Sequence, residues 1–243
     1  MAFLSAPWPN LASVGTLSTT REGGVSLPPF SSLNLGLHVA DNPKHVLQNR
    51  ALVECYLPKP AVWLNQIHSA DVLNANEQYN VEQIQTADAL YTQLKNQPLA
   101  IMSADCLPIL LTSYDGSEVA AIHGGWRGLE KGIIKNTLAC FKSSANQINA
   151  WLGPAIGAKQ FEVGAEVAAL FNQQSPLFQS AFVLQPNQKY LCDIYLIARI
   201  QLQQLGVINI SGGEYCTVSQ SSEFFSYRRE GKTGRMASLI WRK

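Results

Sequence analysis

Short apolar runs separated by polar or turn-forming residues fill the middle of the chain. The runs AVWLNQI, ADVLNA, DALYT, LAIMSA, LPILLT and EVAAIH all lie between residues 61 and 123. Runs of this length, bounded by turn formers, are typical of β-strands. We therefore expect residues 61–123 to form a succession of short strands.

Apolar residues at helical spacing follow polar capping residues in several other segments. Asp41-Asn42-Pro43 combines a capping side chain with a proline suited to the first turn. Gly206 follows the last apolar stripe and is a good helix terminator. The expected helices cover residues 42–56, 133–141, 162–173 and 189–206.

Further strands are expected at 149–153, 181–185, 207–211 and 237–241, so strands and helices alternate in the second half. Strands in the first half followed by alternation in the second indicate a mixed α/β fold. No internal repeat or linker marks a boundary, and we expect residues 1–243 to form a single domain.

Composition and charge restrict the class of protein. Apolar residues make up 47% of the chain and charged residues 14%, which indicates a compact folded protein. The formal net charge is +1 and no basic run is present, so we expect no nucleic-acid partner. No run approaches the ~20 apolar residues of a spanning helix, so we expect no membrane partner. The sequence gives no indication of oligomeric state.

Cysteine usage and the first residues of the chain indicate the compartment. The five cysteines form an odd set without framework spacing, which favours a reducing environment. The first basic residue is Arg21, and no long apolar stretch precedes it, so we expect no signal peptide. We therefore expect a cytoplasmic protein.

His68, Cys106 and His123 each lie in a turn-like break beside an apolar run. One thiolate and two imidazoles suit zinc, and three protein ligands leave a fourth position open, as in catalytic sites. The chain has no CxxC or HxxxH pattern, so a structural zinc finger is not indicated. If these residues bind a metal, the fold must bring three distant segments together.

Other interpretations of these residue types stay open at this stage. A buried free cysteine is usually an inert apolar residue, and a lone histidine is usually structural. His38, in a turn-rich segment, and His45, in an expected helix, compete with His68 and His123 as ligands. The remaining cysteines are Cys55, Cys140 and Cys192, which we assign to packing, and Cys216, which we leave undecided.

Two glycine-containing corners could bind an anion. Gly124-Gly125 follows a predicted strand and precedes a helix, with Arg127 beside it as a fork for phosphate or carboxylate. Arg21 begins a second corner of this kind. The simpler interpretation of each is a tight turn. We interpret residues 227–231 as a charged hairpin, and three tryptophans as core residues or stacking platforms: Trp63, Trp126 and Trp151.

Taken together, the motifs resemble one family. In order they are TREGGVS, SLNLGLHVADNP, NQIHSADV, ADAL, SADCLPILL, AIHGGWRGL, WLGPAIG, FEVG and FFSYRREGKTGRMA. They are similar to segments of the YfiH-like proteins, long described as polyphenol oxidases or laccases, and extend from Thr19 to Trp241. Ala40 stands where the family usually has glycine, and Gly124 where it often has alanine.

The resemblance implies a layered sandwich of mixed β-sheets flanked by helices, with zinc bound by His68, Cys106 and His123. It implies phosphorolysis of purine nucleosides (adenosine, inosine, guanosine and methylthioadenosine), with adenosine deamination in the same pocket. Relatives are also linked to the correction of peptidoglycan precursors. The substrates would then be purine nucleosides and phosphate.

This chemistry needs groups beyond the metal ligands. We expect Arg21, Arg127 and the amides near Gly125 to hold phosphate, and Asn34 and His38 to contact sugar or base. For deamination, zinc would activate a water molecule, and Asp105 or Asp88 would carry the proton.

The laccase description itself is disfavoured, although copper is an alternative occupant of the three-residue site. A laccase needs a blue copper and a three-copper cluster, and such sites are rich in imidazole. The chain has four histidines, two of them already used, which cannot ligate four coppers. Three alternatives remain: a metal-free hydrolase with Cys106 and a histidine as nucleophile and base, a cell-wall precursor editing factor, and a non-enzymatic zinc-bound scaffold.

Overall fold

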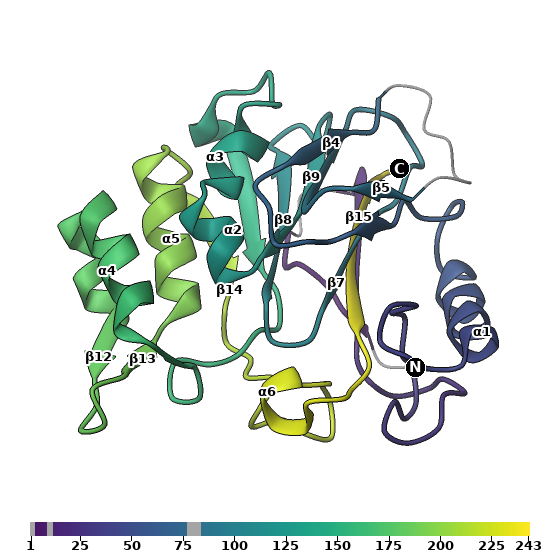
Figure 1. Cartoon of the computed structure of the whole chain (residues 1–243). Coiled ribbons are helices and arrows are strands. Elements are labelled where there is room, and N and C mark those ends of the chain that lie inside the picture. Colours follow the sequence, from purple (N-terminus) through teal and green to yellow (C-terminus); the bar gives the residue numbers. More distant parts are fainter. Residues whose placement is uncertain (1–2, 9–11, 77–83) are drawn as a thin grey trace.

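Two β-sheets stacked face to face form the centre of the protein (Figure 1). The computed structural model describes residues 3–8, 12–76 and 84–243. The four-stranded sheet is antiparallel, in the order β1 (Phe3–Leu4), β2 (Val14–Thr19), β15 (Met236–Arg242) and β7 (Leu99–Ser103). The six-stranded sheet is mixed, in the order β14 (Asn209–Gly212), β10 (Ile148–Leu152), β8 (Leu107–Ser113), β9 (Val119–Gly124), β6 (Ala89–Thr92) and β4 (Val72–Asn74).

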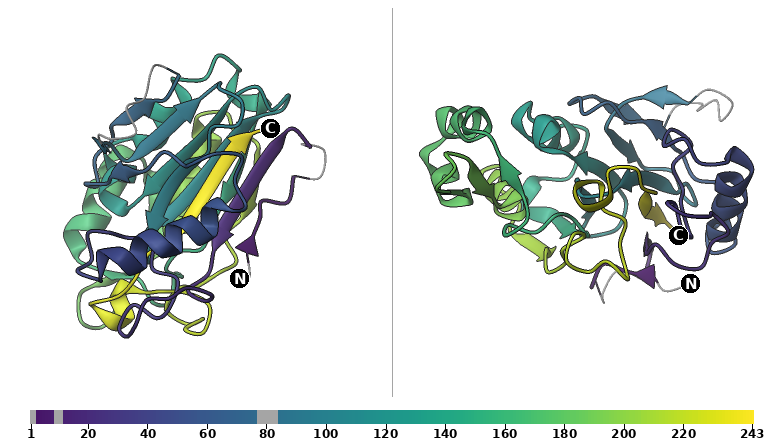
Figure 2. Two further views of the ribbon diagram at one scale, coloured as in Figure 1. Left: turned by 90° about the vertical axis from the view of Figure 1, so that its right-hand side faces the viewer. Right: turned by 60° about the horizontal axis from the view of Figure 1, so that its bottom comes forward.

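Helices cover the outer face of each sheet (Figures 1 and 2). The outer face of the six-stranded sheet carries α2 (Trp126–Glu130), α3 (Ile133–Leu138) and α5 (Ile194–Gln204). The outer face of the four-stranded sheet packs against α1 (Pro43–Glu54). The expected layered sandwich of mixed sheets flanked by helices is therefore confirmed.

Smaller elements complete these layers. At the far side of α5 lie α4 (Ala165–Gln174), the 3-10 helix η2 (Pro176–Ala181) and a three-stranded sheet of β11 (Glu162–Val163), β13 (Tyr190–Cys192) and β12 (Phe182–Leu184). The others are β3 (Leu64–Asn65) paired with β5 (Gln85–Thr86), η1 (Ala145–Gln147) and α6 (Tyr227–Glu230). None of the helices in the described part of the chain has the length and apolar character needed to cross a membrane.

Alternation along the central strands explains the stacking. In β8, Leu107, Ile109 and Leu111 pack toward the helices, whereas Leu110 packs toward the other sheet. Successive side chains of a strand point to opposite faces, so a strand that is apolar on both faces must be covered on both. The continuous apolar runs at 99–103, 107–113 and 119–124 are therefore the buried strands of the two sheets.

Two expected helices begin later than the sequence suggested. The segment expected as one helix over 189–206 contains β13 and then α5, because Asp193 caps the helix by accepting a hydrogen bond from Leu196 N at 2.9 Å. The segment expected over 162–173 likewise opens with β11 before α4 begins at Ala165. Edge pairing of β11 and β12 with β13 outweighs local helical preference there.

Three other expectations need correction. The strand expected over 61–67 is reduced to β3 and a single bridge from Val62 to Leu99. The charged hairpin at 227–231 is instead the short helix α6, capped by Ser226, whose side chain accepts a hydrogen bond from Arg229 N at 3.2 Å. Cys55, which we assigned to packing, is exposed just after α1.

Ala40 occupies a left-handed backbone conformation with a φ of 63°. Left-handed geometry costs a residue with a Cβ atom about 1–2 kcal/mol, and glycine loses about 0.4–1 kcal/mol through its freer unfolded state. Replacing Ala40 by glycine should therefore raise the free energy of unfolding by about 0.5 kcal/mol. Denaturant unfolding would measure this, and a variant less stable than the parent would contradict it.

Candidate metal centre

The side chains of His68, Cys106 and His123 converge where β3 and β9 end and β8 begins. His68 follows β3, Cys106 lies between β7 and β8, and His123 lies in β9. Their ligand atoms all lie within 4.8 Å of one another. Cys106 Sγ is 3.7 Å from His68 Nε2, and the ring centroids of His68 and His123 are 4.8 Å apart. The structure thus brings together residues that are as many as 55 positions apart along the chain (123 − 68).

Strand register and two left-handed residues produce this convergence. β8 and β9 are antiparallel, with Leu107 opposite Gly124, so Cys106 emerges beside the end of β9. Asp105 and His68 have φ values of 97° and 60°. A left-handed conformation at a residue with a side chain is held by its surroundings and often occurs at functional sites. Here it turns each chain segment toward the cluster.

Asp88 fixes two of the three candidate ligands at once. Its fully buried carboxylate accepts hydrogen bonds from the amides of Ile67, His68 and Ser69, at 3.1, 2.9 and 2.6 Å. The same carboxylate is 2.8 Å from Nδ1 of His123. Burial alone would raise the pKa of Asp88, but hydrogen bonds from His123 and Ser69 hold it well below the usual range. This arrangement leaves Nε2 of His123 free to face Cys106.

The thiol and the second imidazole shift each other's ionisation. Burial would raise the pKa of Cys106, but the adjacent imidazoles of His123 and His68 outweigh it and lower the pKa to about 6. Burial would lower the pKa of His123, but the Cys106 thiolate and the Asp88 carboxylate raise it to about 9. In the metal-free protein the pair is therefore a thiolate and an imidazolium near neutral pH.

Alkylation of the metal-free protein should reveal this thiolate. Because the thiolate fraction rises as pH rises through about 6, the rate of Cys106 modification by iodoacetamide should reach half its maximum near that pH. In denaturant the midpoint should return to about 8.5. Peptide mapping by mass spectrometry separates Cys106 from the other four cysteines. Identical midpoints in the folded and denatured protein would contradict the prediction.

The cluster fits a zinc ion by distance and donor type. Zinc–sulfur and zinc–nitrogen bonds of about 2.3 and 2.1 Å at a tetrahedral angle place the two donors about 3.6 Å apart. The observed separation of Cys106 Sγ from His68 Nε2 is 3.7 Å. Asp88 supplies the carboxylate that commonly orients a ligating histidine. The donor set therefore matches a three-ligand site.

Gly125 lies against this cluster. A Cβ atom built on Gly125 would lie 2.7 Å from His68 Cδ2 and 3.3 Å from Cys106 Sγ, so only glycine allows the close approach. At Gly124 a Cβ would lie 2.8 Å from the Leu107 carbonyl oxygen, so an alanine there requires a shift between β8 and β9. Gly125 is buried and does not line the adjoining pocket, so its place in the site is steric.

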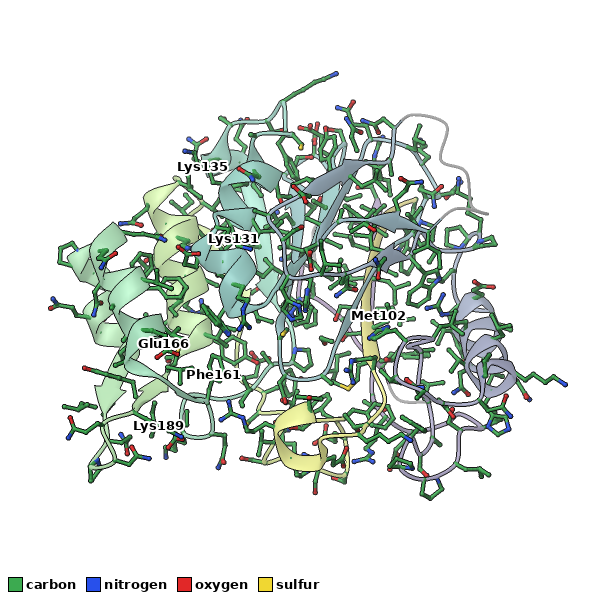
Figure 3. All side chains as sticks on the ribbon, viewed as in Figure 1. Met102, Lys131, Lys135, Phe161, Glu166 and Lys189 are labelled. Atoms are coloured by element: carbon green, nitrogen blue, oxygen red, sulfur yellow. The ribbon has the colours of Figure 1, made fainter. Side chains whose placement is uncertain are left out.

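A pocket of about 650 Å³ opens from the metal cluster. His68, Cys106 and His123 form part of its wall, together with aromatic and basic side chains. Met102 and Phe161 belong to the lining and lie on different sides of it, toward β7 and toward the three-stranded sheet (Figure 3). This volume is in the range of small-molecule sites in proteins, about 300–1,000 Å³.

The expected substrate residues divide into two groups. His38 and Arg127 both line the pocket, and Arg127 stacks on Trp126 at 4.3 Å from the ring centroid. Arg21 does not line it, because its guanidinium pairs with Glu230 at 2.9 Å and donates to backbone carbonyls. Asn34 is completely buried outside it and bonds to main-chain groups and Asp41. We therefore remove Arg21 and Asn34 from the substrate-contacting set.

The two carboxylates considered as proton carriers have other partners. Asp105 lines the pocket, but it accepts hydrogen bonds from Thr217 Oγ1 at 2.6 Å and from Arg228 N at 2.7 Å. Asp88 is occupied by His123 and three amides. Both carboxylates position neighbouring segments: Asp105 ties the turn before Cys106 to α6.

Sequence reasoning missed several residues of the pocket. The basic ones are Arg228 and Arg235, and the aromatic ones include Phe161 and Tyr227. Their signal was present in the segments FEVG and FFSYRREGKTGRMA, which we matched as motifs without assigning roles. Arg228 also donates to the carbonyl oxygens of Gln160 and Glu162, at 3.4 and 3.0 Å.

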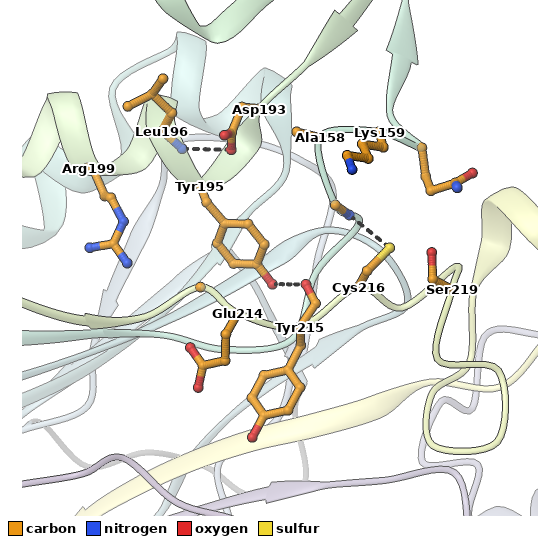
Figure 4. A pocket seen from close by; sticks show the side chains of 13 residues that line it. Ala158, Lys159, Asp193, Tyr195, Leu196, Arg199, Glu214, Tyr215, Cys216 and Ser219 are labelled. Atoms are coloured by element: carbon orange, nitrogen blue, oxygen red, sulfur yellow. Dashed lines mark hydrogen bonds between the residues drawn. The ribbon is translucent and has the colours of Figure 1, made fainter.

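A second pocket, of about 450 Å³, lies beside the start of α5 (Figure 4). Its Cys216 Sγ accepts a hydrogen bond from Gly157 N at 3.3 Å, and Tyr195 donates to the Tyr215 carbonyl at 2.9 Å. Burial would raise the pKa of Cys216, but hydrogen bonds led by Ser219 lower it. None of the expected site residues lines this pocket, which is separate from the His–Cys–His cluster.

Comparison with known proteins places this architecture in a family. Residues 15–243 match the family described as multi-copper polyphenol oxidoreductase laccase. The chain belongs to this family. The crystal structure of another protein, NMB0706 of Neisseria meningitidis, superposes on this chain with a TM-score of 0.97 at 46% identity and full coverage of both chains.

Two named relatives confirm the resemblance to the YfiH-like proteins. The purine nucleoside phosphorylase YfiH of Escherichia coli K12 is 48% identical over 237 residues, covering 96% of each chain. A purine nucleoside phosphorylase of Haemophilus influenzae is 44% identical over 247 residues, covering 99% of each chain.

The multi-copper part of the family description does not match this chain. The sequence contains four histidines, and one group of three or more His, Cys, Asp and Glu side chains in the described ranges has metal-binding spacing. Four copper ions would need a much larger set of imidazoles. The described residues offer one three-residue group that could hold an ion.

Proposed function

We propose that this protein is a zinc-dependent purine nucleoside phosphorylase, acting on adenosine, inosine, guanosine and methylthioadenosine. The observation that carries the proposal is a His–Cys–His cluster that opens into a pocket lined by arginines and aromatic side chains. The names of relatives 44–48% identical over nearly the whole chain support the same activity.

His68, Cys106 and His123 would hold the ion. When bound, zinc would act as a Lewis acid and make a nucleophile available at neutral pH. Two imidazoles and one thiolate also suit copper, so copper is an alternative occupant. The free cysteines and the absence of framework spacing support a cytoplasmic location, where the thiolate ligand stays reduced.

Phosphorolysis requires the pocket to hold two substrates in line. An oxygen of phosphate bonds to the anomeric carbon of ribose while the bond from that carbon to the purine nitrogen breaks, and the purine leaves with the electron pair. The guanidinium groups of the pocket would hold the phosphate charge. Trp126 and Phe161 would offer apolar faces to the purine and exclude water, which otherwise competes with phosphate.

Adenosine deamination is proposed as a second activity of the same pocket. It exchanges the amino group of the purine for oxygen from water, and ammonia leaves. Because the carboxylates of Asp105 and Asp88 are occupied by hydrogen bonds, we assign them to positioning in this reaction too.

A metal-free hydrolase is the second candidate, favoured by one observation. Cys106 Sγ lies 3.7 Å from His68 Nε2, and the pKa of the thiol is lowered to about 6, as a nucleophile–base pair would require. Accumulation of an acyl-enzyme on Cys106 would support it, and loss of activity on removal of the metal would exclude it. Editing of cell-wall precursors is tested separately, by muropeptide analysis of a deletion strain.

Elemental analysis of the purified protein, combined with product identification, tests the main proposal. With adenosine and phosphate we expect about one zinc per chain and the products adenine and ribose 1-phosphate. Omission of phosphate should abolish adenine release but leave inosine formation, which reports deamination. Full activity in protein stripped of metal by chelation, or no adenine with phosphate present, would refute it.

A further inference from the structure

Two guanidinium groups and one imidazole lie at the segment 34–38, at one wall of the pocket. They are His38, Arg50 and Arg235, and none of them forms an ion pair with a carboxylate of the described residues. A Cβ atom built on Gly36 would lie 2.8 Å from Arg235 Cγ and 3.4 Å from His38 Cε1, so both side chains lie over the same glycine. His38 and Arg235 also line the pocket.

Arg235 is held in place with part of its guanidinium unused. Nη1 donates to the carbonyl oxygens of Thr233 and Gly234, at 3.1 and 3.0 Å. The backbone N of Arg235 donates to Asn34 Oδ1 at 2.9 Å, and its carbonyl accepts from Leu35 N at 3.1 Å. Within the described ranges, Nε and Nη2 make no hydrogen bond. Those groups are available to a ligand in the pocket.

Arg50 adds a buried charge behind this wall. Arg50 is 9% exposed. Its guanidinium carbon lies 3.9 Å from the centroid of the Trp63 ring, and its Nε donates a hydrogen bond to the Leu35 carbonyl at 3.0 Å. Nη2 lies 3.7 Å from the sulfur of Met102, which lines the pocket. Burying a cation without a paired anion costs free energy, and an anion bound nearby would offset that cost.

Arg127, by contrast, suits a different part of the substrate. It is exposed on α2, and its guanidinium stacks on Trp126. Among the described residues the Arg127 guanidinium makes no hydrogen bond that fixes its orientation, whereas that of Arg235 is fixed by two carbonyl oxygens. Arg127 therefore fits the rim of the pocket.

We propose that the pocket binds inorganic phosphate between the guanidinium of Arg235 and the imidazole of His38, with the buried charge of Arg50 strengthening the attraction. This assignment rests on the proposed phosphorylase function. A planar guanidinium matches two phosphate oxygens, and an imidazole N–H donates to a third. Phosphate held there faces the pocket that contains the metal cluster.

Steady-state phosphorolysis with phosphate and adenosine varied in turn tests the assignment. For Arg235→Met we expect the KM for phosphate to rise about tenfold or more, and for His38→Gln several-fold, with the KM for adenosine changed less than about twofold. Arg127→Met should raise the KM for adenosine and not that for phosphate. Lys131→Met, an exposed residue outside the pocket, is the matched charge-removal control.

A thermal-shift measurement with phosphate alone needs no turnover. Phosphate should raise the Tm of the parent protein and of Lys131→Met, and the increase should shrink in Arg235→Met and His38→Gln. If Arg235→Met does not fold, the exposed His38→Gln still decides. A shift that persists in both variants, or a phosphate KM that responds to Arg127 alone, overturns the assignment. A parent that binds phosphate through Arg235 but releases no adenine would refute the phosphorylase function and leave the subsite standing.

Discussion

Cys106→Ala should purify without metal and lose on the order of a thousandfold in kcat/KM for adenosine phosphorolysis, a loss of several kcal/mol of transition-state stabilisation. The reason is geometric: Cys106 supplies the sulfur donor of the cluster, and two imidazoles alone leave the ion with half of a tetrahedral set. Elemental analysis and initial-rate kinetics on the same preparation measure both losses.

Cys55→Ala is the matched control, because Cys55 is an exposed free thiol just after α1. It should keep metal content and rate unchanged. A Cys106→Ala protein that is folded, free of metal and fully active would end the metal-dependent mechanism. One that keeps its metal would show that Cys106 is not a ligand.

Asp88→Asn should lower metal affinity about 10–100-fold and the free energy of unfolding by about 2–4 kcal/mol. The amide keeps the shape of the carboxylate but replaces one acceptor oxygen by an NH₂ group. That group would face either the amides of residues 67–69 or His123. Competition with a coloured chelator measures the first change and denaturant unfolding the second.

The exposed Asp71 provides the comparison, since Asp71→Asn removes the same charge nearby without touching the cluster. It should change neither quantity. A loss of stability in Asp88→Asn with normal metal affinity would contradict the view that Asp88 orients His123, and would reduce its role to holding the backbone at 67–69.

The candidate ligands could be singled out from the sequence because their chemistry and their position coincide. His68, Cys106 and His123 each stand where an apolar run ends, and strand ends are where side chains leave the core. The strands at 99–103, 107–113 and 119–124 were predictable for the same reason, since their apolar residues are continuous and short. The strands needed only local sequence, whereas the choice of His68 and His123 over His38 and His45 came from the family resemblance.

The errors concern residues whose partners are remote. Arg21 was expected to bind phosphate, but it pairs with Glu230, 209 positions away. Arg235 was missed because its location depends on β15 pairing between β2 and β7. The apolar residues of segment 189–206 suit a strand and a helix alike. Only the capping residue Asp193 marks the point where strand β13 ends and helix α5 begins. Local patterns carry no information about such pairings.

The central position of β15 has a consequence for how the protein is made. Ser18 of β2 and Ser238 of β15 hydrogen-bond to each other across 220 positions, so the four-stranded sheet cannot close before β15 leaves the ribosome. Contacts so distant along the chain form slowly. Until then β7, which leads into Cys106, lacks its neighbour β15 in that sheet, although the chain already carries all three candidate metal ligands.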